Sequence, residues 1–309
     1  MAKKDFNVDA WREAKKDQSA QLKEDLAEKI LALRSTEEWQ KYLDVKSHFA
    51  SYSFNNLMLI YMQKPDALHV GGYGFWKKEK NPVKKGEKAI YIVAPIIKKL
   101  DSDGIESVDG EKKAVGFHYV PVFDVSQTET GRDWYDEINQ CRELTFEAED
   151  TFVNMQKVVA HFGLNLKETI EELPPGAKGM FVPEENAIYL LSSMSSGMKV
   201  KTLSHELAHY LTHGKSLYED NRELHELAAE STAYVFCQRL GIDTAEYSIA
   251  YLGGWSKDIK DEDLKEVIHA LSNAVSNAAE KIYETYNEVV RPEMVQEINS
   301  PNYELGYNR

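Results

Sequence analysis

The sequence is poor in cysteine and in long apolar runs. It has only two cysteines, Cys141 and Cys237, in 309 residues. Two thiols without a framework spacing favour a reducing compartment and argue against structural disulfides. The longest apolar stretch, residues 89–97, is too short to span a bilayer, and the first residues lack the apolar segment of a secretory signal. We therefore expect a cytoplasmic protein with no membrane association.

Several functional signatures are also missing. The sequence has no glycine-rich phosphate loop, no tandem repeat and no convincing Ser/His/Asp set. These absences argue against the usual nucleotide-binding loops, repeat arrays and serine hydrolases. The composition, with 42% hydrophobic and 28% charged residues, is typical of a globular chain of about two domains.

Charge is distributed unevenly along the chain. The formal net charge is −14, which by itself argues against a nucleic-acid partner. Residues 1–130 nevertheless carry 21 basic and 20 acidic side chains, and residues 40–100 carry 11 basic and only 4 acidic ones. The rest of the chain, after residue 130, carries 16 basic and 31 acidic side chains. A locally basic module is therefore joined to a strongly acidic one.

The most specific motif is H-E-x-x-H, formed by His205, Glu206 and His209. Residues i and i+4 lie on one face of an α-helix, so both imidazoles can reach one cation. Leu203 and Leu207 give the same helix an apolar side. Glu206 would then stand beside the metal and take a proton from its bound water, which is the arrangement of a zinc hydrolase. The alternative is a surface helix with two solvated histidines.

A second helix, predicted over residues 221–240, could supply a third ligand. Its small residues would let it lie close to the first helix, and a carboxylate from it would leave the fourth metal position to water. We choose Glu230 as this ligand, with Glu226, one turn earlier on the same face, in reserve. His213 lies about 12 Å along the helix from His205, so a solvated role is favoured for it.

The first module interleaves aromatic rings with lysines and amides. Rings can stack on unpaired bases and lysines can neutralise phosphates, which is how single-stranded nucleic acid is held. The alternative, which composition alone favours, places the rings in the core and the lysines on a solvated face. The candidate DNA-binding residues are Tyr52, Asn55, Asn56, Tyr73, Trp76, Lys77, Lys84, Lys85 and Lys88.

The pattern of elements predicts an α+β fold. Strands are expected at residues 70–76, 89–95 and 116–123 of the first module. A hairpin over residues 179–191, with its turn at residues 183–186, directly precedes the motif helix. Its second strand, residues 187–191, is the candidate edge for an extended peptide substrate, with an ordinary buried hairpin as the alternative.

These elements group into two domains and a tail. We place a mixed α/β domain at residues 1–135 and a mainly helical domain with a small sheet at residues 145–290. A long helix over residues 261–290 completes the second domain, with its apolar residues on one stripe. Residues 291–309 are expected to form a C-terminal tail.

A set of short segments, in matching order over most of the chain, resembles one known family. They are Ser51-Tyr-Ser-Phe-Asn-Asn56, Gly72-Tyr-Gly-Phe-Trp76, Val83-Lys-Lys-Gly-Glu-Lys-Ala-Ile90, Ala94-Pro95, Val122-Phe-Asp-Val-Ser-Gln-Thr128, His205-Glu-Leu-Ala-His209, Glu226-Leu-Ala-Ala-Glu230 and Tyr251-Leu-Gly-Gly-Trp255. These segments are similar to those of the ArdC antirestriction family, which is carried on plasmids and other mobile genetic elements. The acidic loop at residues 101–111 and the overall acidity depart from that pattern.

The resemblance implies a domain and a role for each half of the chain. It implies that the N-terminal domain binds single-stranded DNA and that the C-terminal domain is a zincin-like metallopeptidase. The strand-then-helix order before the motif is also similar to small zinc peptidases of the ImmA/IrrE type. Carried over by position, the family pattern implies His205, His209 and Glu230 as a gluzincin-like set of Zn²⁺ ligands, with Glu206 as the catalytic carboxylate.

The sequence therefore predicts an antirestriction-type protein that binds single-stranded DNA and hydrolyses a protein or peptide substrate. Glu206 would pass the proton of the zinc-bound water to the departing amine. No residue is assigned to the oxyanion, although Tyr210 and Tyr234 are near in sequence. Two alternatives stay open. One is a non-enzymatic DNA- or nuclease-binding protein with a structural or vestigial zinc site, and the other is a sensor protease that cleaves a specific repressor.

Overall fold

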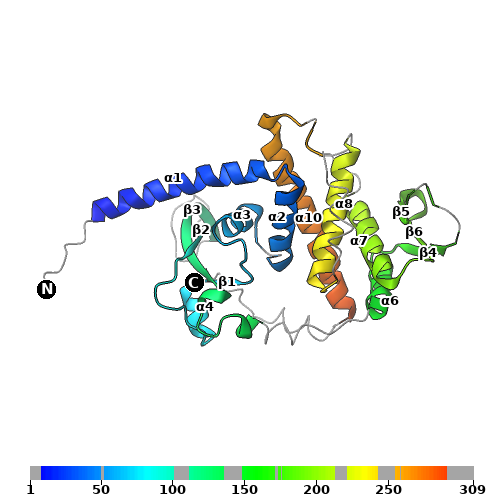
Figure 1. Ribbon diagram of the computed structural model, residues 1–309, viewed down its shortest axis with the longest axis horizontal. Coiled ribbons are helices and arrows are strands. Elements are labelled where there is room, and N and C mark those ends of the chain that lie inside the picture. The colour runs from blue at the N-terminus through cyan, green and yellow to red at the C-terminus, as the bar shows by residue number, and fades with distance from the viewer. Residues whose placement is uncertain are drawn as a thin grey trace. The chain divides into compact units, whose positions relative to one another are not determined.

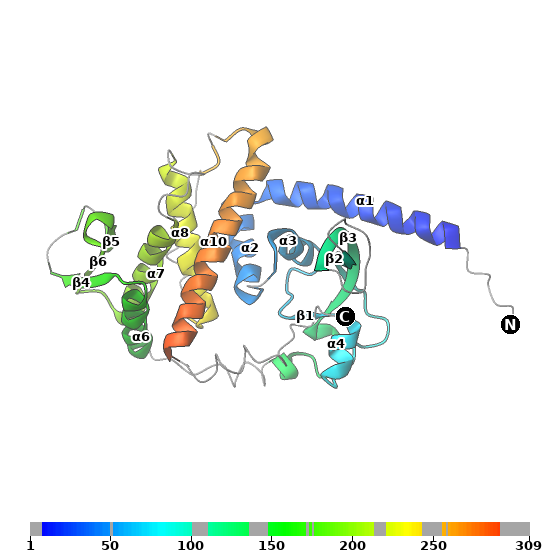
Figure 2. The ribbon, with the colours of Figure 1, turned by 180° about the vertical axis from the view of Figure 1, so that it is seen from behind.

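The chain folds into two compact units, described here from a computed structural model (Figures 1 and 2). The first unit comprises Met1–Ala32 and Asn55–Gly131, and the second comprises Leu33–Phe54 and Arg132–Arg309. The structure describes residues 8–49, 52–100, 111–135, 148–170, 173–174, 176–212, 221–242, 255–257 and 259–290. Residues 33–54 thus group with the second unit, although the sequence placed them in the first domain. The expected tail at 291–309 lies outside the described residues.

Each unit combines helices with a three-stranded sheet, which confirms the α+β fold. In the first unit, β1 (Val70–Gly71), β3 (Glu111–Asp124) and β2 (Ile90–Leu100) pair in that order, all antiparallel. The strands expected at residues 89–95 and 116–123 are therefore confirmed. The strand expected at residues 70–76 is wrong beyond Gly71, because residues 73–78 form helix α4 (Tyr73–Lys78).

Burial of Trp76 explains this difference. Its side chain is fully buried, and its indole N–H donates to the Phe123 carbonyl at 2.8 Å. A turn of helix after Gly72 carries the ring into the core of the unit, where the N–H finds its acceptor. The alternation of glycines and aromatic residues in this segment has the period of a strand, so the pattern alone predicts a strand where a helix forms.

Two side-chain amides of α3 (Phe54–Gln63) bind the edge of β2. The Asn56 amide accepts from the Val93 N–H and donates to the Val93 carbonyl, both at 2.8 Å. The Gln63 amide makes the same pair of bonds with Tyr91, both at 2.9 Å. Each amide thus takes the place of a neighbouring strand, so backbone groups of an edge strand are satisfied. The first unit also contains the long helix α1 (Val8–Ala32).

The second unit is built around a layer of helices. They are α2 (Thr36–His48), α6 (Ala148–His161), α7 (Ser196–Thr212), α8 (Arg222–Arg239) and α10 (Asp261–Val290). Helix α8 packs against α2, α7 and α10, and the Trp39 indole N–H donates to Ser231 Oγ at 2.9 Å across the α2–α8 contact. No helix in the described ranges is both long and apolar enough to cross a bilayer.

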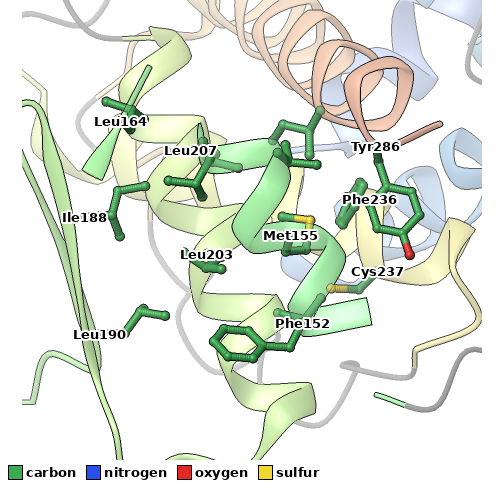
Figure 3. Close-up of a cluster of buried hydrophobic side chains, with 14 residues drawn as sticks. Phe152, Met155, Leu164, Ile188, Leu190, Leu203, Leu207, Phe236, Cys237 and Tyr286 are labelled. Carbon is green, nitrogen blue, oxygen red and sulfur yellow. The ribbon is translucent and has the colours of Figure 1, made fainter. Parts of the chain in front are cut away.

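The hydrophobic core of the second unit fixes how α7 is rotated. Leu203 and Leu207 of α7 are fully buried against α6 and the sheet, together with Met155, Ile188 and Leu190 (Figure 3). These leucines take one face of the helix into the core. The H-E-x-x-H residues are thereby turned toward α8 and the sheet edge described next.

The sheet of the second unit has the order β4 (Asn165–Thr169), β6 (Ala187–Leu191), β5 (Gly179–Val182). The predicted hairpin is confirmed, with its turn closed by Asn186 in the left-handed conformation (φ 49°). The expectation that residues 187–191 form an open edge is wrong. Strand β6 is central, because it pairs in parallel with β4 as well as antiparallel with β5. The strand that lies at the edge and contacts α7 is β5.

Candidate metal centre

Helix α7 brings its two motif histidines together. His205 and His209 are one turn apart, and their rings lie 4.7 Å apart between centroids at an interplanar angle of 75°. Their Nε2 atoms are 3.0 Å apart, and their side chains are 20% and 24% exposed. The two nitrogens can share one proton or ligate one cation. The expected stacking of i and i+4 imidazoles on one face is therefore present.

Helix α8 adds a carboxylate to this pair. Glu226 Oε2 lies 3.5 Å from His205 Nε2 and 3.7 Å from His209 Nε2. One ligand atom from each of the three residues lies within 4.8 Å of the others. The Glu226 side chain is 49% exposed, so the centre has a side open to solvent. Two imidazoles and a carboxylate with an open position are the donor set of catalytic zinc sites, and these residues therefore fit Zn²⁺.

Glu230 contacts His205 on the side of the ring that faces away from Glu226. Its Oε2 lies 3.1 Å from His205 Nδ1, which is the ring nitrogen that does not face Glu226. Its Oε1 forms an ion pair with Lys201 Nζ at 2.5 Å. The structure therefore gathers Glu226, the reserve of the sequence analysis, about the two Nε2 atoms and directs Glu230 to the other side of the ring.

Glu206 lies on the buried side of the motif. It is 6% exposed, and its Oε2 accepts the Phe181 N–H of β5 at 2.8 Å. A Cβ atom on Gly179 would lie 2.5 Å from Thr202 Cγ2 and 3.2 Å from Glu206 Oε1. The absence of a side chain at Gly179 thus lets β5 lie directly on α7. The Phe181 N–H contact fixes the carboxylate, and the sequence motif gives no sign of it.

Burial and charge pairing shift the pKa values of these groups in opposite directions. Burial lowers the pKa of His205, but Glu226 and Glu230 outweigh it and raise that pKa to about 9. Burial raises the pKa of Glu230, but His205 and Lys201 bring it down to about 2. His205 and His209 hold the pKa of Glu226 well below its ordinary value. Burial raises the pKa of Glu206, against the two histidines. The arrangement of carboxylates about His205 thus favours positive charge at this position.

The two tyrosines near the motif direct their hydroxyls to other groups. The Tyr210 hydroxyl donates to the Phe162 carbonyl at 3.5 Å, and the Tyr234 hydroxyl donates to Asp44 of α2. His213 lies outside the described residues. These contacts give no support to either tyrosine as a stabiliser of an oxyanion.

The candidate DNA-binding residues divide by exposure. Trp76 is in the core, the Asn56 amide is bonded to β2, and Lys84 Nζ donates to the Ser126 carbonyl at 3.3 Å. Tyr52, assigned to the second unit, is half-buried with its ring 5.5 Å from that of Phe49. The exposed candidates of the first unit are Asn55, Tyr73, Lys77, Lys85 and Lys88.

Comparisons with known proteins point to one family. Residues 16–125 match the model of the N-terminal domain of anti-restriction factor ArdC. An uncharacterized protein of Bacillus anthracis, pXO2-81, is 26% identical over 318 residues, which cover 88% of this chain and 54% of the relative. The chain thus spans about half the length of this curated relative.

Two crystal structures of the antirestriction ArdC protein from plasmid R388 are also similar. The metal-free structure is 19% identical, covers 77% of this chain and 86% of its own, and has a TM-score of 0.48. The Mn(II)-bound structure is 18% identical, covers 84% and 96%, and has a TM-score of 0.51, which shows a common fold. Residues 16–125 thus match the family of ArdC N-terminal domains, within a chain whose fold is similar to that of the ArdC protein.

Proposed function

We propose that the chain is an antirestriction-type cytoplasmic protein with a zinc-dependent peptidase centre in its second unit. The observation that carries the proposal is the convergence of His205 Nε2, His209 Nε2 and Glu226 Oε2 beside the buried carboxylate of Glu206. Two histidines and a glutamate are a ligand set of zinc peptidases. Held there, Zn²⁺ would supply Lewis acidity toward a peptide carbonyl.

Glu206 is the proposed general base and acid. Because its pKa is raised by burial, the carboxylate is better matched to proton transfer near neutral pH than an exposed glutamate. It would take a proton from the attacking water and return it to the departing amine. The Phe181 N–H, bonded to one of its oxygens, would keep the carboxylate oriented during both transfers.

Strand β5 is the proposed docking edge for the substrate. It is at the edge of its sheet and lies on α7 beside Glu206. An extended peptide can add to such an edge by backbone pairing. The bare backbone at Gly179 lets the strand lie close to α7, so a peptide paired with β5 would lie near Glu206. The substrate is therefore expected to bind in extended form.

Metal removal tests the peptidase proposal. The full chain is stripped with a chelator, reloaded with Zn²⁺ or Mn²⁺, and incubated with a random peptide library that is read by mass spectrometry. We expect cleavage with reloaded protein and none with stripped protein. If both ions bind at one per chain and neither restores cleavage, the non-enzymatic alternative holds. A cleavage rate that changes on addition of single-stranded DNA would favour the sensor protease.

We also propose that the first unit binds single-stranded DNA. Tyr73 and Lys77 are both exposed and are four residues apart on α4, so they share one face of the helix. Tyr73 as a residue is 60% exposed, so its ring is open to solvent. A ring that can stack on a base next to an ammonium group that can meet a phosphate is the arrangement that single strands require.

Replacing both residues tests this proposal. The double variant Tyr73→Ala, Lys77→Ala should bind a labelled single-stranded dT30 oligonucleotide about 10-fold or more weakly, because stacking contributes about 1–3 kcal/mol per base. Fluorescence anisotropy at two salt concentrations measures it, and one lost phosphate contact should make the salt slope shallower by about 0.7. Lys265→Ala, an exposed lysine of α10, is the control. Equal affinity of the double variant and the control would contradict the assignment.

A further inference from the structure

Lys201 occupies an unexpected place for a lysine. It lies on α7 one turn before His205, and its side chain is only 11% exposed. Its Nζ is 2.5 Å from Glu230 Oε1, and the Glu230 side chain is also 11% exposed. A buried lysine–glutamate pair on the helix that bears the metal motif is not part of H-E-x-x-H, and the mechanism proposed above does not use it.

An ion pair with little exposure costs desolvation free energy, which is a disadvantage if its only role is to hold two helices together. Removing both charges from water costs several kcal/mol per ion, and replacement by apolar residues is often neutral or stabilising. The neighbouring α8 positions Ala229 and Ala233 are buried and apolar, so an apolar contact would suit this interface. Packing alone therefore does not explain why a lysine and a glutamate lie at this contact.

The contact made by the second oxygen of Glu230 indicates another role for the pair. Lys201 Nζ contacts Oε1 while Oε2 contacts His205 Nδ1 at 3.1 Å. The opposite nitrogen of the same ring, Nε2, is the one that meets His209 and Glu226. Ammonium, carboxylate and imidazole thus form a continuous chain that ends at the ligand cluster. A carboxylate on Nδ1 fixes the proton there and leaves the Nε2 lone pair for a cation.

We propose that Lys201 is a positioning residue of the metal centre, which acts through Glu230 on His205. Its ammonium anchors one oxygen of Glu230 away from the cluster, so that the other oxygen stays on Nδ1 and Glu226 alone supplies the carboxylate ligand. It also balances charge, because Glu206, Glu226 and Glu230 carry three negative charges and a divalent cation supplies only two positive ones. The inference rests on the proposed metal centre and adds a residue to it.

A close control exists on the same helix. Lys199 is two residues away, its side chain is 13% exposed, and its Nζ lies 2.5 Å from Glu168 Oε2. It thus matches Lys201 in burial and in ion pairing, but its partner lies on β4 and contacts no motif histidine among the described bonds. Lys199→Met measures what the loss of a largely buried α7 lysine and its ion pair does without any effect on His205.

The test is a set of Zn²⁺ affinities, measured by competition with a chromophoric chelator on the full chain. Lys201→Met should bind Zn²⁺ about 10–100-fold more weakly than wild type, the range found when partners behind a ligand are removed. Glu230→Gln should show a similar loss, and the double variant should lose no more than Glu230→Gln, because both act through one path. Lys201→Arg should stay within about threefold of wild type, since it keeps the charge, as should Lys199→Met.

Equal Zn²⁺ affinity of Lys201→Met and Lys199→Met would overturn the proposal. If Lys201→Met does not fold, the double variant, which leaves no unpaired buried charge, takes its place, and wild-type affinity in that protein would also overturn it. Wild-type protein that binds neither Zn²⁺ nor Mn²⁺ would remove the metal centre itself, together with this inference. The two failures are distinct, because only the second is seen without any substitution.

Discussion

Replacing Glu206 by glutamine is expected to lower the rate of peptide hydrolysis by a factor of about 10²–10⁴, the usual contribution of a positioned general acid–base. Glutamine keeps the shape of the side chain and an oxygen that can accept the Phe181 N–H, so the contact between β5 and α7 is preserved. What is lost is the ability to take and return a proton. Cleavage of the best library peptide, followed at saturating substrate, measures the effect.

Two readouts separate this loss from damage to the site. Bound Zn²⁺ should stay at the wild-type level, because Glu206 accepts the β5 amide and is not in the ligand cluster. Binding of single-stranded DNA should also be unchanged, since the candidate residues of α4 belong to the other unit. A glutamine variant that retains more than a tenth of the wild-type rate with full metal content would exclude Glu206 as the proton carrier.

The helix that carries the candidate metal centre could be predicted because its signal is local. His205 and His209 must share a face wherever residues i and i+4 are helical, and Leu203 and Leu207 require a buried side. The choice between Glu226 and Glu230 as the third ligand does not depend on a local signal. Both lie on one face of α8, one turn apart, so only the offset between the two helices along their axes decides which carboxylate meets Nε2 and which meets Nδ1. That offset comes from tertiary packing.

The prediction that residues 187–191 form the edge for the substrate was wrong for a related reason. The pattern of residues 179–191 shows a hairpin, but it contains no information on which of its two strands receives a third. Strand β4 pairs in parallel with β6 and leaves β5 outside. Lys201 was missed because a single lysine in a helix is ordinarily a solvated residue. Its burial, with a partner on α8, becomes visible only when the helices are packed.

Replacing Glu226 by alanine is expected to weaken Zn²⁺ binding more than a hundredfold. This loss exceeds the range of about 10–100-fold expected when a residue that only hydrogen-bonds to a metal ligand is removed. One of three converging ligand atoms is removed. Because the side chain is 49% exposed, the change should leave the fold intact, although metal-free protein should lose some stability together with the contacts between Glu226 and the two imidazoles. Chelator competition measures the affinity, and thermal unfolding without metal checks the fold.

The comparison with neighbouring glutamates decides which carboxylate binds the ion. Glu223→Ala, an exposed residue one turn before Glu226 on α8, removes a negative charge near the centre and should change affinity little, so it controls for long-range electrostatics. If Glu230→Gln weakens binding more than Glu226→Ala does, the ligand is Glu230, as the sequence alone indicates. The opposite order is expected, because Glu230 meets the ring nitrogen that faces away from the cluster and its other oxygen is committed to Lys201.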